Sequence, residues 1–175
     1  MNPNQIQKRL PPVLLAITFC LVSFPTQALP TDKDQVIKIS AKSAFFDQKQ
    51  GLATYTGAVK LSQGSLEISA DKITVLLGKD QKPETAIAEG NPAYYQLQPD
   101  ADKAVIHAEA NIVRYAVSKD YITLEKNAFV EQNGATTRGG KIDYDMANGT
   151  VSASGAGNES GRVEFVIPPQ TNKKD

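Results

Sequence analysis

The chain has 175 residues, with 19 basic and 19 acidic side chains and one histidine. This balance gives no strongly basic field, which argues against nucleic acid as a partner. The single cysteine, Cys20, excludes an intramolecular disulfide and a thiolate metal centre. His107 has no second histidine or cysteine with which to share a metal or activate a nucleophile. We therefore predict no catalytic residues, no metal site and no cofactor.

The segment 1–28 has the pattern of a secretory signal peptide. Lys8 and Arg9 supply positive charge, Leu10–Phe24 is an apolar run, and Thr26–Ala28 offers small residues for cleavage after Ala28. The run is shorter than the roughly 20 residues of a spanning helix, and an uncleaved anchor is the alternative. We expect an exported protein whose mature chain begins at Leu29.

After this leader the chain reads as short strands separated by turns, with no helical period. Turn signals include Gln63-Gly64 and Asn148-Gly149, and Asn91-Pro92 is expected to break a strand. We predict one all-β domain over residues 29–175, ordered over about 36–168. The predicted strands are 36–41, 53–61, 66–75, 86–90, 93–98, 104–108, 111–117, 121–125, 128–132, 141–146, 150–154 and 162–167.

One of these stretches changes phase in the middle. Leu66 and Ile68 alternate with polar residues, as on a strand with one apolar face, but Ile73 and Val75 have the opposite parity. The slip falls at Ala70-Asp71. We interpret it as a bend or bulge at which the strand changes direction.

The same unit recurs about four times. Each unit is anchored by a small residue. The first and second anchors are as far apart in the sequence as the third and fourth, and the second and third are farther apart. A Gly or Asn follows each anchor at a similar distance. Gly and Asn tolerate the positive φ that a sharp bend requires. The pattern predicts a repeated strand, bend and strand, with a polar insertion around residues 78–84. The anchors are Ala41, Ala70, Ala110 and Gly139, and the second landmarks are Gly57, Gly90, Asn127 and Gly155.

The first and last predicted strands carry little of the charge that usually protects a sheet edge. Both alternate apolar and polar residues. We therefore predict head-to-tail strand pairing between copies. The predicted interface residues are Val36, Ile37, Lys38 and Ile39 at one end and Val163, Phe165 and Ile167 at the other.

Several segments together resemble the OstA-like family of lipopolysaccharide export proteins. They are IxIxA (Ile37–Ala41), TGAVKLSQGSLEISADKI (Thr56–Ile73), GNPAYYQLQ (Gly90–Gln98), LEKNAFVEQ (Leu124–Gln132) and RVEFVIP (Arg162–Pro168). The resemblance covers residues 36 to 168 and follows a suitable leader. It departs from the usual pattern at Ala41-Lys42 and Gly139-Gly140, where the family often carries an acidic residue.

The resemblance implies an antiparallel β-jellyroll, V-shaped in section, with an apolar groove for the acyl chains of lipid A. It implies a periplasmic bridge that carries lipopolysaccharide between the membranes. Its partners would be itself, head to tail, an inner-membrane LptC-like protein and an outer-membrane LptD-like protein. By family position, the lining residues are Ile37, Ile39, Tyr94, Tyr115 and Val117, with Tyr95 as the alternative to Tyr94.

Nine further apolar residues are expected in either the groove or the core, and the sequence does not separate the two. They are Val59, Leu61, Leu66, Ile68, Ile73, Val75, Leu124, Phe129 and Ile142. Alternative readings are an LptC-like adaptor anchored in the inner membrane and a structural β scaffold with a filled core. An enzyme using the carboxylate pair Asp143 and Asp145 is a fourth reading, although a solvated strand face explains that pair more simply.

Overall fold

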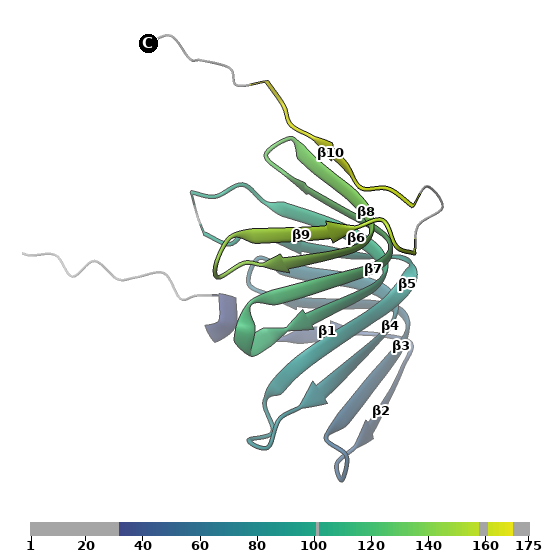
Figure 1. The fold of residues 1–175 in the computed structure, drawn as a ribbon. Helices are drawn as coiled ribbons and strands as arrows, with labels where there is room; N and C mark the ends of the chain where they lie inside the picture. Colours follow the sequence, from purple (N-terminus) through teal and green to yellow (C-terminus); the bar gives the residue numbers. More distant parts are fainter. Residues whose placement is uncertain (1–31, 101, 158–160, 170–175) are drawn as a thin grey trace, which may run out of the picture.

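The computed structural model describes residues 32–100, 102–157 and 161–169, and the predicted signal peptide lies outside them. Ten antiparallel strands form a single sheet, and the two short 3-10 turns are η1 (Asp32–Asp34) and η2 (Val117–Lys119) (Figure 1). The all-β prediction is confirmed. The strands are β1 (Lys38–Ser40), β2 (Ser43–Asp47), β3 (Leu52–Gln63), β4 (Leu66–Leu77), β5 (Pro83–Leu97), β6 (Ile106–Ala116), β7 (Tyr121–Gln132), β8 (Ala135–Asp145), β9 (Thr150–Ser154) and β10 (Glu164–Val166).

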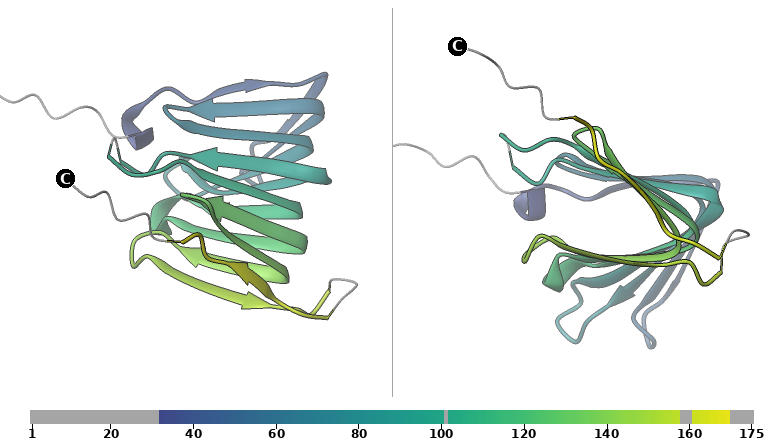
Figure 2. Two further views of the ribbon diagram at one scale, coloured as in Figure 1. Left: turned by 90° about the horizontal axis from the view of Figure 1, so that it is seen from above. Right: turned by 45° about the horizontal axis from the view of Figure 1, so that its top comes forward.

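The sheet is folded along a line that crosses the middle of β3 to β8, so it has two walls and a V-shaped section, the predicted jellyroll (Figure 2). Wall A runs from β1 to β10 and wall B from β2 to β9. Wall A comprises residues 38–40, 59–63, 66–69, 93–97, 106–109, 128–132, 135–139 and 164–166. Wall B comprises 43–47, 52–56, 72–77, 83–89, 112–116, 121–125, 141–145 and 150–154.

The predicted repeat marks this fold line. Hydrogen-bonded register is interrupted between Thr56 and Val59, between Ser69 and Lys72, and at the matching places in β5 to β8. In β4, β5, β6 and β8 the parity of the buried residues changes across the interruption, which is the phase slip seen in the sequence. Six of the anchors and second landmarks lie at these bends, whereas Ala41 lies between β1 and β2 and Gly155 follows β9.

The strands β3 and β7 bend in a different way. Each carries two consecutive residues with positive φ, Gly57-Ala58 in β3 and Lys126-Asn127 in β7. Their buried residues keep the same parity on both sides of the bend. The left-handed pair therefore turns the strand without exchanging its faces.

Two glycines show why the bends need small residues. Gly57 has φ of 91°, and a Cβ there would meet the side chain of Lys42 at 2.8 Å. At Gly139 a Cβ would meet the carbonyl oxygen of Ser154 at 2.8 Å. Such contacts are closer than van der Waals distance allows, and positive φ disfavours any other residue at Gly57.

Three asparagines connect successive strands along the outside of the fold line. Asn111 Nδ2 donates to Asn91 Oδ1 at 3.3 Å, and Asn127 Nδ2 donates to Asn111 Oδ1 at 3.0 Å. Side-chain amides donate and accept at once, so they extend hydrogen bonding across positions where the backbone ladder is interrupted.

Inward-facing apolar side chains from both walls form one core. Its residues of 0 % or 1 % exposure include Ile73, Val113, Leu124 and Ile142. Among the described residues, no polar or charged side chain is fully buried. The fold is therefore held by sheet hydrogen bonding and apolar burial.

Asn91-Pro92 does not break a strand, so that prediction was wrong. β5 runs without interruption from Pro83 to Leu97, and its pairing with β6 skips from Glu89 to Ala93. The missing N–H of proline therefore falls in the bulge, where the ladder makes no hydrogen bond. The strands predicted at 104–108 and 111–117 likewise form one strand, and Val117 lies in η2.

Both terminal strands are shorter than predicted. β1 covers Lys38–Ser40, which pairs with Ser62 to Lys60 of β3, and Val36 and Ile37 lie before it. β10 covers Glu164–Val166 because pairing with β8 runs only from Arg138 to Thr136. Val163 and Ile167 flank β10 and lie outside it.

The core is expected to respond strongly to truncation. Leu124→Ala removes a side chain with 0 % exposure and should lower the free energy of unfolding by about 2–5 kcal/mol, since a cavity remains. Ile112→Ala is the matched control, because Ile112 is the half-buried neighbour of Val113 on the opposite face. Urea unfolding of both variants would measure the difference, and an equal loss in both would contradict the assignment of the inner face.

Candidate apolar groove

A cavity of about 300 Å³ lies between the two walls at the end of the sheet where β1 to β5 lie. This volume is at the lower end of the range for small-molecule sites. Ile37 and Phe46 line the cavity and remain 37 % and 53 % exposed, so it opens to solvent. Its lining is Ile37, Ile39, Leu61, Gln63, Leu66 and Ile68 on the wall A side, and Phe46, Ala53, Tyr55, Val75, Leu77, Pro83, Ala86, Tyr115 and Val117 on the wall B side.

The cavity brings together eight of the residues expected in a groove. The residues from wall A and from the segment just before β1 line the cavity together because β1, β3 and β4 are neighbours in the sheet. Tyr115 and Val117 form the boundary toward the middle of the molecule. The eight are Ile37, Ile39, Leu61, Leu66, Ile68, Val75, Tyr115 and Val117.

The remaining predicted residues divide into core and outer face. Tyr94 is 50 % exposed, whereas its neighbour Tyr95 is 2 % exposed, so the expectation of an inward Tyr94 was wrong. Phe129 also lies on the outer face, where the guanidinium of Arg138 stacks 4.2 Å from its ring centroid. Both follow from the alternation of β-strands, since Tyr95 and Val130 occupy the inward positions. Val59, Ile73, Tyr95, Leu124 and Ile142 belong to the buried core and do not line the cavity.

Sequence reasoning missed seven lining residues. No predicted strand covered Phe46. Because side chains alternate along a strand, adjacent Phe45 and Phe46 on β2 place one aromatic ring on each face of the sheet, so one of them had to face inward. Ala53 and Tyr55 have the same parity as Leu61 and could have been found from it, because β3 keeps its inward parity across the bend. The other four, Gln63, Leu77, Pro83 and Ala86, lie near strand ends or are small, and carry little signal.

Two tyrosines meet where the cavity ends. The rings of Tyr95 on wall A and Tyr115 on wall B form an edge-to-face pair with centroids 5.9 Å apart. Burial, with the nearby Asp120 carboxylate, raises the pKa of Tyr115 to about 12, and burial raises the pKa of Tyr95 further. Both hydroxyls are therefore neutral at physiological pH, and the Tyr115 hydroxyl donates to Asp120 Oδ1 at 3.4 Å.

The rim of wall A beside the cavity is held by polar contacts from η1. The Ser65 hydroxyl donates to the Asp32 carboxylate, and Gln63 Nε2 donates to the Gln35 carbonyl at 3.1 Å. Ser65 Oγ also accepts a hydrogen bond from the Gln98 N–H at 3.0 Å and lies 3.1 Å from the Gln98 carbonyl oxygen. These contacts fix the segment leading into β1, and with it the position of Ile37.

Asp143 and Asp145 are engaged in structural contacts. Partial burial opposes ionisation of Asp143, but hydrogen bonds from Lys141, at 2.8 Å, and Thr123, at 2.8 Å, outweigh it and lower its pKa. Hydrogen bonds from Asn148 lower the pKa of Asp145. Neither carboxyl has the raised pKa that a general acid of a glycosidase needs.

The described part of the chain offers neither a metal site nor a membrane-spanning helix. It contains no group of three or more His, Cys, Asp or Glu side chains placed to hold a metal ion. Within the same residues, no helix has the length and apolar character needed to cross a membrane.

Comparison with known proteins gives a consistent set of relatives. Residues 38–150 match the family model described as LptA/(LptD N-terminal domain) LPS transport protein. The chain is 35% identical over 164 residues to the lipopolysaccharide export system protein LptH of Pseudomonas aeruginosa, covering 91% of this chain and 94% of the relative. It is 33% identical over 159 residues to LptA of Escherichia coli K12, covering 90% and 84%.

A solved structure agrees. The crystal structure of Pseudomonas aeruginosa LptH superimposes with a TM-score of 0.73 at 36% identity, over 80% of this chain and all of that one. That protein is described as the LptA-homologous periplasmic component of the conserved lipopolysaccharide transport device. The match in sequence extends over most of both proteins, and the bent sheet is common to both. The chain therefore belongs to the LptA/(LptD N-terminal domain) family of LPS transport proteins.

Proposed function

We propose that this protein binds lipopolysaccharide in the periplasm and carries it between the inner and outer membranes, with its acyl chains in the apolar groove. The observation that carries the proposal is the open cavity, whose lining is apolar apart from Gln63 and two tyrosines. The names of the relatives agree, because they describe lipopolysaccharide export. They describe no enzyme, and we propose a role without catalysis or cofactor.

The energetics of an acyl chain explain why such a groove is needed. Moving a chain of roughly 12 carbons through water costs about 9 kcal/mol, at about 0.8 kcal/mol per CH₂. An apolar groove removes this barrier without binding the ligand tightly. The groove needs only to offer an acyl chain an apolar environment similar to that of the next groove along the path.

The exposed apolar side chains support continuation of the groove from one molecule to the next. Of the ten large hydrophobic residues exposed in the described part of the chain, eight lie on or beside the strands at the two ends of the sheet, β1, β2, β9 and β10. Concentration of exposed apolar surface in this way marks an interaction site. The eight are Val36, Ile37, Phe45 and Phe46 at one end, and Val151, Phe165, Val166 and Ile167 at the other.

The strand directions at the two ends are compatible in both walls. In wall A, β10 runs from the fold line to the rim and β1 from the rim to the fold line, so pairing β10 with β1 of the next copy is antiparallel. In wall B, pairing β9 with β2 is antiparallel for the same reason. Inward positions at both ends are apolar, including Ile39 at one and Phe165 at the other. Head-to-tail pairing would therefore extend both the sheet and its apolar face.

We propose three kinds of partner that use these ends: a second copy of this chain, an LptC-like protein at the inner membrane and an LptD-like protein at the outer membrane. We also propose that the signal peptide is cleaved after Ala28. Cleavage separates this role from that of a membrane-anchored adaptor. An intact mass beginning at Leu29 would support it, and retention of Leu10–Phe24 would favour the adaptor.

Ligand capture should depend on which face carries the probe. A photoreactive amino acid at Tyr115 should crosslink to purified lipopolysaccharide, because Tyr115 lines the groove. The same probe at Tyr94 is the matched control, since that tyrosine is on the outer face. Gel mobility shifts detected with an antibody to lipopolysaccharide would report capture. Capture from Tyr94 and not from Tyr115 would contradict the proposal.

Assembly should place opposite ends of two copies together. The mature chain has no native cysteine, so Ile39→Cys in one copy and Phe165→Cys in another should form a mixed disulfide dimer under mild oxidation. Mixing Ile39→Cys with Leu76→Cys is the control, because Leu76 is exposed but lies away from the ends. Non-reducing electrophoresis measures both. Equal dimer yields in the two mixtures would argue against strand pairing at the ends.

A further inference from the structure

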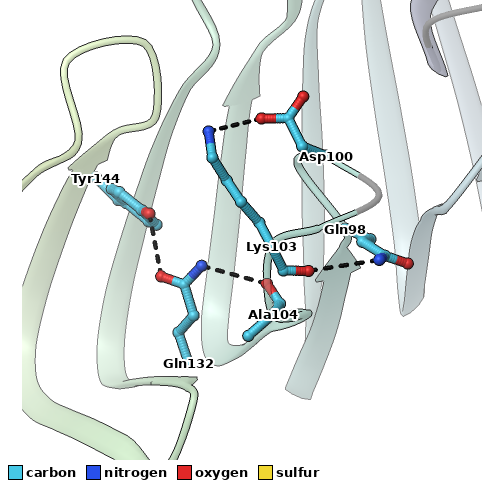
Figure 3. A network of polar contacts seen from close by, with 6 residues as sticks. All are labelled: Gln98, Asp100, Lys103, Ala104, Gln132 and Tyr144. Atoms are coloured by element: carbon cyan, nitrogen blue, oxygen red, sulfur yellow. Dashed lines mark hydrogen bonds and ion pairs between the residues drawn. The ribbon is translucent and has the colours of Figure 1, made fainter.

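Beyond the cavity, a hydrogen bond from β8 to β7 joins the two walls. The Tyr144 hydroxyl on wall B donates to Gln132 Oε1 on wall A at 3.4 Å (Figure 3). Gln132 Nε2 in turn donates to the Ala104 carbonyl at 3.2 Å. Gln132 therefore joins wall B to the loop between β5 and β6.

That loop has its own polar contacts. Lys103 and Asp100 form an ion pair at 2.6 Å, and Gln98 Nε2 donates to the Lys103 carbonyl at 3.4 Å (Figure 3). Because Ala104 follows Lys103 directly, these contacts position the carbonyl that Gln132 uses. The chain of contacts thus runs from the end of β5 across the rim of wall A to Tyr144.

A second contact joins wall A to the residue that follows β8. The Tyr95 hydroxyl donates to Met146 Sδ at 3.8 Å, and sulfur is a weak acceptor. Neither this contact nor the one between Tyr144 and Gln132 is a short, charged hydrogen bond of the strong kind. A ligand can replace these two hydrogen bonds at low cost, whereas the walls are also held together by the buried side chains of the core.

Apolar surface faces inward on both sides of the closure. Toward β1 lies the cavity that ends at Tyr115 and Val117. Toward β10, Phe165 pairs with Thr137 and Val151 pairs with Tyr144, so both take inward positions, and they are 60 % and 45 % exposed. In the strand order of the sheet, the Tyr144–Gln132 contact lies between these two apolar regions.

We propose that Tyr144 and Gln132 form a clasp between the walls, which acyl chains must part to move from the β1–β5 cavity toward the β9–β10 end. This inference rests on the proposed function. The clasp determines how far a ligand enters: one confined to the cavity leaves it closed, and one in transit opens it. Tyr144 and Gln132 are thus specificity-determining residues of the path, with Tyr95 and Met146 in the same closure.

The separation of the walls beside the clasp tests this directly. Thr136 on β8 of wall A and Ser152 on β9 of wall B have outward positions, so paired spin labels there leave the groove clear. We expect purified lipopolysaccharide to lengthen the distance between the labels. Tyr144→Phe and, separately, Gln132→Leu should raise the ratio of open to closed molecules by about fivefold without ligand, as loss of one ordinary hydrogen bond predicts.

The control is Tyr121→Phe, which removes a hydroxyl from the outer face of wall B and should leave the distance unchanged. The probe at Tyr115, used in the same samples, separates two kinds of failure. Capture at Tyr115 with an unchanged distance would overturn the clasp and leave the proposed function standing. Failure of capture at Tyr115 would overturn the proposed function and the clasp together.

Discussion

The structure depends on six strands bending at the same line. Each of β3 to β8 loses its regular pairing there. In β4, β5, β6 and β8 the bulge also restores the inward direction of the apolar side chains beyond it, which strict alternation would direct to solvent. Small residues such as Gly139 permit the bend, and the asparagine ladder connects successive strands along it. A flat sheet of this sequence would have no protected face.

Bending a single sheet also explains why its interior is only partly filled. The core must come from one layer facing itself, so the distance between the walls decides whether side chains meet. From β5 to β8 they do, through Tyr95, Tyr115 and Tyr144. Toward the β1 and β2 end the walls leave a cavity between them. The unpaired strand edges at the two ends of the sheet and the cavity between its walls thus both result from bending a single sheet.

The fold could be predicted from the sequence because its signals are local. The phase slip at Ala70-Asp71 and the spacing of the anchors correspond to bulges in the structure. The groove was predicted less completely, because alternation fixes which face a residue takes and not whether another wall touches it. Leu61 lines the cavity and Ile73 is packed, although both have the same pattern. Tyr94 was misplaced because family position decided that prediction, although alternation with Ala93 and Leu97 points Tyr95 inward.

The most direct test of the unfilled interior uses isoleucine methyl groups as reporters in NMR. A single-chain fatty acid should perturb the methyl signals of Ile37, Ile39 and Ile68, which line the cavity. It should leave Ile87 and Ile112 unchanged, since both take outward positions beside buried neighbours. Perturbation confined to the outward isoleucines, or no perturbation at saturating fatty acid, would contradict an apolar groove open to acyl chains.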